Sequence, residues 1–303
     1  MNRKLLFFAI SCLVMLLSCS AQEDLGNFTS KPVNVEKPDT ISKPADSDDD
    51  TIVVQDPVVQ DPVIVAQNSI IAHRGAWKKN NFPQNSIAAL KEAIRLGCKG
   101  SEFDIWFTAD DSLIVNHDRI YNNLIVQNAS YSQLTALKLS NGENLPTLRE
   151  YIQAAKENNT TTKLVCHFQE GLNPVRRKLF ATKIFECINK LKAQYLIIYA
   201  SDSYALLKEI RAKDALVDTR YLMGNAFPPE QVKKDNISGI FYYDSAYTNN
   251  PEWIESARAN NLTLSVSGAN NIDRIKWYLK NNFDAILTDE PEFLIKLQSS
   301  LVN

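Results

Sequence analysis

Three histidines are present in the chain, and each ends or follows a short apolar run, at 69–72, 112–116 and 163–166. Runs of this kind predict buried strands. The carboxyl ends of strands are where α/β barrels place their catalytic groups, and histidine is suited to proton transfer near neutral pH. A single histidine in such a position is more often a hydrogen-bonded core residue. Three of them at equivalent strand ends, His73, His117 and His167, favour a catalytic site.

Two acidic residues, Glu102 and Asp104, are separated by one residue in an apolar and aromatic segment. Residues two apart in a strand share a face, so both carboxylates point the same way. Side by side in a barrel interior they repel each other unless a cation lies between them, and hard divalent cations prefer oxygen ligands. The alternative is a solvated strand face, which the buried-type residues Phe103, Ile105 and Phe107 disfavour.

These residues belong to an ordered series of motifs. The series resembles the pattern of the glycerophosphodiester phosphodiesterase family, which reads H-R-G, P-E-N-T, E-x-D, T-x-D and H-D. Two further segments, 145–150 and 284–291, resemble the family's I-P-T-L-E-E and G-I-x-T-D-x-P segments, so the resemblance covers residues 69–296. The matching motifs are His73-Arg74-Gly75, Pro83-Gln84-Asn85-Ser86, Glu102-x-Asp104, Thr108-x-Asp110 and His117-Asp118.

The resemblance implies a (β/α)8 TIM barrel, and the alternation of strand and helix patterns independently predicts a parallel α/β barrel. A small strand insertion, 112–116, is expected after the second barrel strand. Helices are predicted from 85 or 86 to 97 and at 146–158, 174–192, 202–213, 249–260 and 270–282. Barrel strands are predicted at 69–72, 101–107, 163–168, 195–199, 216–222, 238–243, 262–266 and 284–288.

The resemblance also implies a chemical role for each matching residue. In the resembling enzymes a glycerol hydroxyl of the substrate attacks phosphorus while one histidine accepts its proton and the other protonates the leaving alcohol; water then opens the cyclic phosphate. The planar fork of an arginine suits bidentate contact with phosphoryl oxygens. By position, His73 and His117 resemble the acid–base pair, Arg74 the phosphate ligand, Glu102 and Asp104 metal ligands, and Asn85 and Asp118 supporting residues.

The chain departs from the family pattern on its third barrel strand. His167 stands where the family has a third metal-ligating Glu, and Gln169 stands where it has a Lys; Ser267 replaces a Trp and Gln84 a Glu. The resemblance implies one divalent ion, magnesium or calcium, held by Glu102, Asp104 and His167. An imidazole ligand shifts the preference toward manganese or zinc. In the alternative, His167 only hydrogen-bonds a neighbour and the ion rests on two carboxylates and water.

The predicted function is metal-dependent hydrolysis of small glycerophosphodiesters to glycerol 3-phosphate and an alcohol. One alternative is a related barrel phosphodiesterase acting on phospholipid head groups, although the E-x-D and T-D-x-P segments favour the first prediction. The other is a weakly active or non-catalytic phosphodiester-binding lipoprotein, which the three departures at 167, 169 and 267 support. The sequence has no stripe of basic and aromatic residues of the kind that would indicate a nucleic-acid partner.

Residues 1–19 have the pattern of a secretory signal, with Arg3 and Lys4 before an apolar stretch that is too short to span a membrane. The sequence 16–19 resembles the bacterial lipoprotein cleavage box, which predicts a lipidated Cys19; ordinary secretion is the alternative. The protein is therefore expected to cross the inner membrane and to be lipid-anchored at the outer membrane, on its periplasmic or surface face.

Residues 20–66 are rich in Pro, Asp, Ser and Thr and predict a disordered stalk ahead of a barrel domain at 67–303. The stalk has ten acidic and three basic residues, so its net charge is −7. The whole chain carries −2 and the leader carries +2, which leaves a net charge of +3 on the barrel domain. This balance suits an anionic small substrate. The spacing of Cys98, Cys166 and Cys187 matches no zinc motif, and all three are predicted to be buried. A single disulfide between two of them is the alternative in an oxidising compartment.

Overall fold

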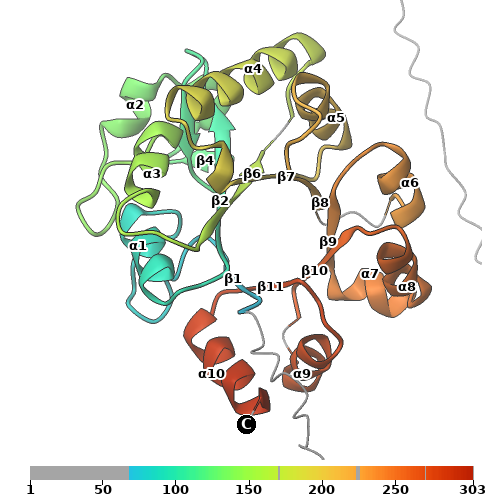
Figure 1. The fold of residues 1–303 in the computed structure, drawn as a ribbon. Coiled ribbons are helices and arrows are strands. Elements are labelled where there is room, and N and C mark those ends of the chain that lie inside the picture. Colours follow the sequence, from blue (N-terminus) through green and yellow to red (C-terminus); the bar gives the residue numbers. More distant parts are fainter. Residues whose placement is uncertain (1–67, 170, 223–225, 270, 303) are drawn as a thin grey trace, which may run out of the picture. The chain divides into compact units, whose positions relative to one another are not determined.

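The computed structural model describes residues 68–169, 171–222, 226–269 and 271–302. The predicted leader and stalk, 1–19 and 20–66, lie outside the described residues. Each of eight strands pairs in parallel with the next, and the first also pairs with the last, so the sheet closes into the predicted barrel (Figure 1). The barrel strands are β1 (Ile70–Ala72), β2 (Gly100–Phe107), β6 (Lys163–Phe168), β7 (Ile197–Ser201), β8 (Thr219–Leu222), β9 (Gly239–Tyr243), β10 (Thr263–Ser267) and β11 (Ala285–Thr288).

Helices surround this barrel and connect its strands (Figure 1). The six predicted helices form, and α6, α7 and α10 are additional helices that the sequence analysis did not include. The helices are α1 (Ile87–Arg95), α3 (Leu148–Ala155), α4 (Pro174–Lys190), α5 (Tyr204–Lys213), α6 (Pro229–Lys234), α7 (Asp244–Asn249), α8 (Glu252–Ala259), α9 (Ile272–Lys280) and α10 (Pro291–Val302), with a 3-10 turn, η2 (Gln194–Leu196), before β7.

Helix α1 shows how the local sequence sets these boundaries. Ser86 is the N-cap, and its hydroxyl accepts a hydrogen bond from the backbone N–H of Ala89 at 3.1 Å. Gly97 follows the helix with φ +66°, a conformation that favours glycine. Between them Leu90 and Ala93 are fully buried against the barrel. The apolar spacing therefore fixes which face of the helix packs on the sheet.

The insertion after the second barrel strand is larger than the single strand predicted for it. β3 (Leu113–Val115) pairs antiparallel with the end of β2. It is followed by a short hairpin, β4 (Ile120–Tyr121) and β5 (Leu124–Ile125), then η1 (Val126–Asn128) and α2 (Tyr131–Thr135). Trp106, Ile114, Val126, Ala129, Leu134 and Leu145 form a buried apolar cluster of their own beneath these segments. This cluster holds the insertion rigidly against the mouth of the barrel.

The largest apolar clusters lie between the strands and the helices, whereas a smaller one, including Val165, Leu222 and Phe241, fills the barrel interior. Burial of each such side chain contributes about 1.5–3 kcal/mol to stability. Cys98, Cys166 and Cys187 are free thiols, so the disulfide that the sequence left open does not form. None of the helices in the described part of the chain is long and apolar enough to cross a membrane.

Candidate active site

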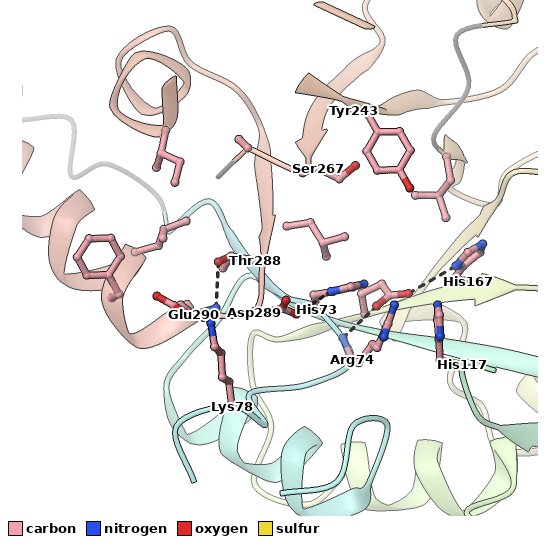
Figure 2. Close-up of a pocket in the computed structure, with 18 of the residues that line it drawn as sticks. His73, Arg74, Lys78, His117, His167, Tyr243, Ser267, Thr288, Asp289 and Glu290 are labelled. Carbon is pink, nitrogen blue, oxygen red and sulfur yellow. Dashed lines mark hydrogen bonds and ion pairs between the residues drawn. The ribbon is translucent and has the colours of Figure 1, made fainter. Parts of the chain in front are cut away.

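A cavity of about 700 Å³ opens at the carboxyl ends of the barrel strands, the end at which TIM-barrel enzymes place their chemistry. All three histidines line it, together with Arg74 and Asp289 (Figure 2). They reach it from the ends of β1, β6 and β11 and from the loop after β3; β1, β6 and β3 all pair with β2, and β11 pairs with β1. The ordered motifs therefore converge in one place.

Glu102 and Asp104 point together into this cavity from β2 and are almost completely buried, at 2% and 1% exposure. Burial and the charge of Asp104 raise the pKa of the Glu102 carboxyl to about 7. Burial also opposes ionisation of Asp104, but hydrogen bonds from His167 and Asn85 hold its pKa well below the usual range. The pair thus shows the mutual repulsion expected of two carboxylates that share a small volume.

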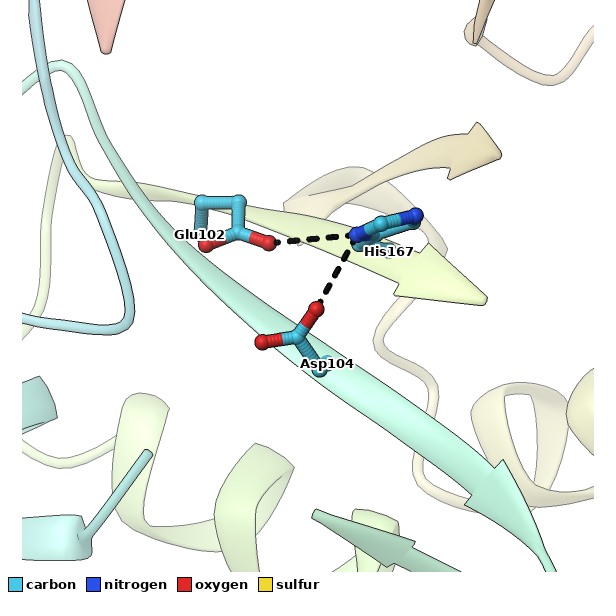
Figure 3. Close-up of side chains that lie close together, drawn as sticks. All are labelled: Glu102, Asp104 and His167. Carbon is cyan, nitrogen blue, oxygen red and sulfur yellow. Dashed lines mark ion pairs between the residues drawn. The ribbon is translucent and has the colours of Figure 1, made fainter. Parts of the chain in front are cut away.

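His167 lies beside Asp104 because these two residues are register partners on β6 and β2. Its Nδ1 atom is 3.0 Å from Asp104 Oδ1 and 3.7 Å from Glu102 Oε1 (Figure 3). Burial alone lowers the pKa of His167, but the carboxylates of Asp104, Asp202 and Glu102 outweigh it and raise that pKa to about 10. The ring is therefore the counter-charge of the carboxylate pair.

The same three side chains meet the requirements of a metal site. One ligand atom from each lies within 4.8 Å of the others, and all three residues are buried. Two oxygen ligands of one calcium or magnesium ion are at most about 4–5 Å apart, since each lies about 2.0–2.6 Å from the ion. Glu102, Asp104 and His167 therefore fit a single divalent ion, with the imidazole as the one nitrogen donor.

His73 has a partner to which the sequence analysis gave no role. Its Nδ1 atom lies 2.8 Å from the Oδ1 atom of Asp289, which follows the last barrel strand. Burial lowers the pKa of His73, but this hydrogen bond and the charge of Glu102 raise it above the ordinary value overall. Asp289 thus stabilises the protonated ring and fixes its orientation.

His117 stands opposite, on the loop that follows β3. Its Nδ1 atom lies 2.8 Å from Asp118 Oδ1, and its backbone carbonyl accepts a hydrogen bond from Trp106 Nε1 at 3.0 Å. The side chain is 40% exposed, whereas that of His73 is 26% exposed. Both rings pair Nδ1 with a carboxylate. Their Nε2 atoms are therefore the nitrogens left for proton exchange with a bound molecule.

Arg74 lines the cavity beside the carboxylate pair. Its backbone N–H donates to Glu102 Oε2 at 3.0 Å, which requires a left-handed φ of +58°. Its guanidinium donates to Gln84 Oε1 at 2.5 Å, and its Nε lies 3.7 Å from Asp104 Oδ2. Gly75 follows with φ +81°, where a Cβ atom would lie 2.7 Å from the backbone of Ala89. The His-Arg-Gly turn therefore has a steric need for its glycine.

Asn85 is buried behind the site and does not line the cavity. Its Nδ2 donates to Asp104 Oδ2 at 3.0 Å, and its Oδ1 accepts from the Asp104 backbone N–H at 3.2 Å. These two hydrogen bonds hold the Asp104 carboxylate in place, and the supporting role of Asn85 in the reaction stays a prediction.

Comparison with known proteins identifies the group to which this arrangement belongs. The model of the Glycerophosphoryl diester phosphodiesterase family matches residues 73–293. The chain belongs to this family. Among curated relatives, a glycerophosphodiester phosphodiesterase of Caldanaerobacter subterraneus subsp. tengcongensis is 25% identical over 75% of this chain and 96% of its own length. Proteins of this family are phosphoric diester hydrolases.

Solved structures agree with this placement. A glycerophosphodiester phosphodiesterase from Parabacteroides distasonis superposes with a TM-score of 0.75 and 29% identity, over 78% of this chain and 98% of that one. A phosphodiesterase from Oleispira antarctica, in complex with the product sn-glycerol-3-phosphate, shares the fold with a TM-score of 0.64 and 21% identity, over 78% and 97% of the two chains.

Within the glycerophosphoryl diester phosphodiesterase family, the departures on β6 change the charge of the site. Gln169 occupies the position of the expected Lys, and its Nε2 donates to Asp104 Oδ1 at 2.8 Å. The group beside the carboxylates at this position is therefore a neutral amide. Ser267, in place of the expected Trp, is buried at the end of β10, lines the cavity and has an Oγ without a hydrogen-bond partner among the described residues.

Proposed function

We propose that this protein hydrolyses small glycerophosphodiesters to glycerol 3-phosphate and an alcohol, with His73 and His117 as the proton-transfer pair and Arg74 as the phosphate ligand. The observation that carries the proposal is the convergence of these three side chains on one cavity beside a buried carboxylate pair. The Oleispira relative in complex with sn-glycerol-3-phosphate supports the choice of product.

The two histidines are suited to different halves of the first step. Asp289 favours the protonated form of His73, so His73 gives its proton to the leaving alcohol oxygen. His117 accepts the proton of the glycerol hydroxyl that attacks phosphorus. The products of this step are the free alcohol and a cyclic glycerol phosphate, and water opens the ring with the two proton transfers reversed.

Charge stabilisation at phosphorus is assigned to Arg74 and to the metal site. Glu102, Asp104 and His167 would hold a divalent cation, which would supply positive charge to the phosphoryl oxygens. Arg74 would contact phosphoryl oxygens through its guanidinium. Asn85 and Gln169 hold Asp104, and Asp118 orients the ring of His117, so none of these three needs to contact the substrate.

A substrate panel tests the proposal directly. Purified protein supplied with a divalent cation is incubated with glycerophosphocholine, glycerophosphoethanolamine and glycerophosphoglycerol, and glycerol 3-phosphate is quantified. Bis(p-nitrophenyl) phosphate, which has no neighbouring hydroxyl, is the control and is expected to react far more slowly. Release of phosphocholine instead would support the alternative of a phospholipid head-group enzyme, and no turnover of any diester would support a binding protein.

The metal preference is expected to depend on His167. In the variant His167→Glu, which restores the family's carboxylate, activation by magnesium or calcium should rise and activation by zinc should fall, because both hard ions favour oxygen ligands. Initial rates across a series of metal concentrations measure this. An unchanged metal profile would remove His167 from the ligand set and leave the two carboxylates and water.

We also propose that Cys19 is acylated and that the acidic segment 20–66 tethers the barrel to the outer membrane. The support is the cleavage-box sequence followed by a polar, Pro-rich tract. Two acyl chains give stable anchoring, whereas one is only marginal. Wild type is expected to partition into a detergent phase and the variant Cys19→Ala into the aqueous phase; equal release of both into the aqueous phase would refute the anchor.

A further inference from the structure

The two ring nitrogens of the buried His167 have different surroundings. Nδ1 faces Asp104 and Glu102, at 3.0 and 3.7 Å (Figure 3). Nε2 points away from them, is buried, and has no hydrogen-bond partner among the described residues. The acid that faces Nε2 is Asp202, whose Oδ1 lies 4.0 Å away. One ring thus lies between the carboxylate pair of β2 and a third carboxylate on the other side.

The barrel places Asp202 there. It directly follows β7, and β7 pairs with β6 so that Ala200 is the register partner of His167. Asp202 is therefore two residues beyond the position beside His167, at the mouth of the barrel. Its side chain is 57% exposed, and closing 4.0 Å to hydrogen-bond distance takes a shift of about 1 Å.

The chemistry of imidazole links the two sides. A neutral ring binds a cation through the nitrogen that has no proton, and its proton is then on the other nitrogen. Metal-bound histidines usually donate that proton to a carboxylate or carbonyl, which fixes the tautomer and raises the basicity of the ligand. A cation bound at Nδ1, which faces Glu102 and Asp104, would take the place of the Nδ1 proton, so the ring would keep its remaining proton on Nε2, on the side of Asp202.

We propose that Asp202 is a positioning residue of the metal site: it accepts the Nε2 proton of His167 and thereby holds Nδ1 toward a divalent cation shared with Glu102 and Asp104. This inference deepens the proposed function and rests on it for the role of the cation. The His167–Asp202 couple also restores the carboxylate charge that the family pattern has at position 167, with the imidazole interposed between that charge and the ion.

A double-mutant cycle on metal binding tests the coupling. Mn²⁺ affinity is measured by electron paramagnetic resonance for wild type, Asp202→Asn, His167→Glu and the double variant. Asp202→Asn is expected to weaken Mn²⁺ binding about 10–100-fold in the wild-type background. In the His167→Glu background it should change the affinity little, because the ring through which Asp202 acts is absent. Asp202→Glu should recover part of the lost affinity.

The outcomes separate three explanations. An equal loss of Mn²⁺ affinity in both backgrounds would mean that Asp202 acts only as a distant negative charge, and it would overturn the inference. The inference would also be overturned if Asp202→Asn lowered the affinity in neither background, or if wild type did not bind Mn²⁺. Asp214→Asn is the matched control, since that acid lies at the C-cap of α5 and its side chain accepts a local hydrogen bond from Leu216 N–H. ¹⁴N coupling to bound Mn²⁺ is expected in wild type and should vanish in His167→Glu.

Because the readout is binding, the inference and the proposed function fail separately. Wild type that binds Mn²⁺ in an Asp202-dependent manner but cleaves no glycerophosphodiester would sustain the coupling and reject the activity. If wild type cleaves the diester but Asp202→Asn binds Mn²⁺ normally, the activity is sustained and the coupling is rejected.

Discussion

Replacing either His73 or His117 with alanine is expected to lower kcat/KM for glycerophosphodiesters by about 10²–10⁴-fold, the usual contribution of a general acid or base. Both rings line one cavity and both have Nδ1 paired with a carboxylate, at 2.8 Å in each case. Each ring therefore offers a single, oriented nitrogen to the substrate. Steady-state rates with glycerophosphocholine, or with the best diester of the panel, measure the loss.

The leaving group distinguishes the two roles. A glycerol phosphodiester of p-nitrophenol needs little protonation on departure, so it should largely restore the rate of His73→Ala and leave His117→Ala slow. Circular dichroism and thermal unfolding serve as the control that both variants keep the fold. Wild-type rates in both variants would reject the mechanism, and rescue of His117→Ala alone would exchange the two assignments.

Removing the guanidinium of Arg74 is expected to lower kcat/KM by about 10²–10³-fold, the cost of losing one preorganised donor to a developing charge. The group is held by Gln84 and lies 3.7 Å from Asp104, so it does not have to be ordered when the phosphate binds. Arg74→Lys should recover only part of the loss of Arg74→Ala, because an ammonium cannot make the bidentate contact.

A surface arginine provides the comparison. Arg95 pairs with Glu92 on the outside of α1, and Arg95→Ala is expected to leave kcat/KM unchanged. Inhibition by glycerol 3-phosphate should weaken in Arg74→Ala and stay constant in Arg95→Ala. Activity of Arg74→Ala within threefold of wild type would show that the phosphate is bound elsewhere.

The parts of this site that could be predicted are those recorded in local sequence. The period of two along β2 places Glu102 and Asp104 on one face, and the apolar runs that precede the histidines place them at strand ends. The eight barrel strands follow from similar patterns, because most are short, largely apolar runs and β2 alternates apolar with polar residues. Local spacing is sufficient for these features since each concerns a single element.

The parts that could not be predicted depend on which elements become neighbours. Asp289 is 216 residues from His73 and meets it only because β11 closes on β1. Asp202 faces His167 only through the pairing of β6 with β7. The short helices α6 and α7, of six residues each, have too few turns for an apolar period to stand out.

The pairing of β1 with β11 also has a consequence for how the protein matures. His73, directly after the first barrel strand, is made 216 residues before Asp289 and gains that carboxylate only after the last barrel strand has been synthesised. Contacts between residues so far apart in the sequence form late in folding, because the chain loses the entropy of loop closure before the contact can stabilise the fold. A nascent or truncated chain that ends before Asp289 therefore has His73 without its carboxylate partner.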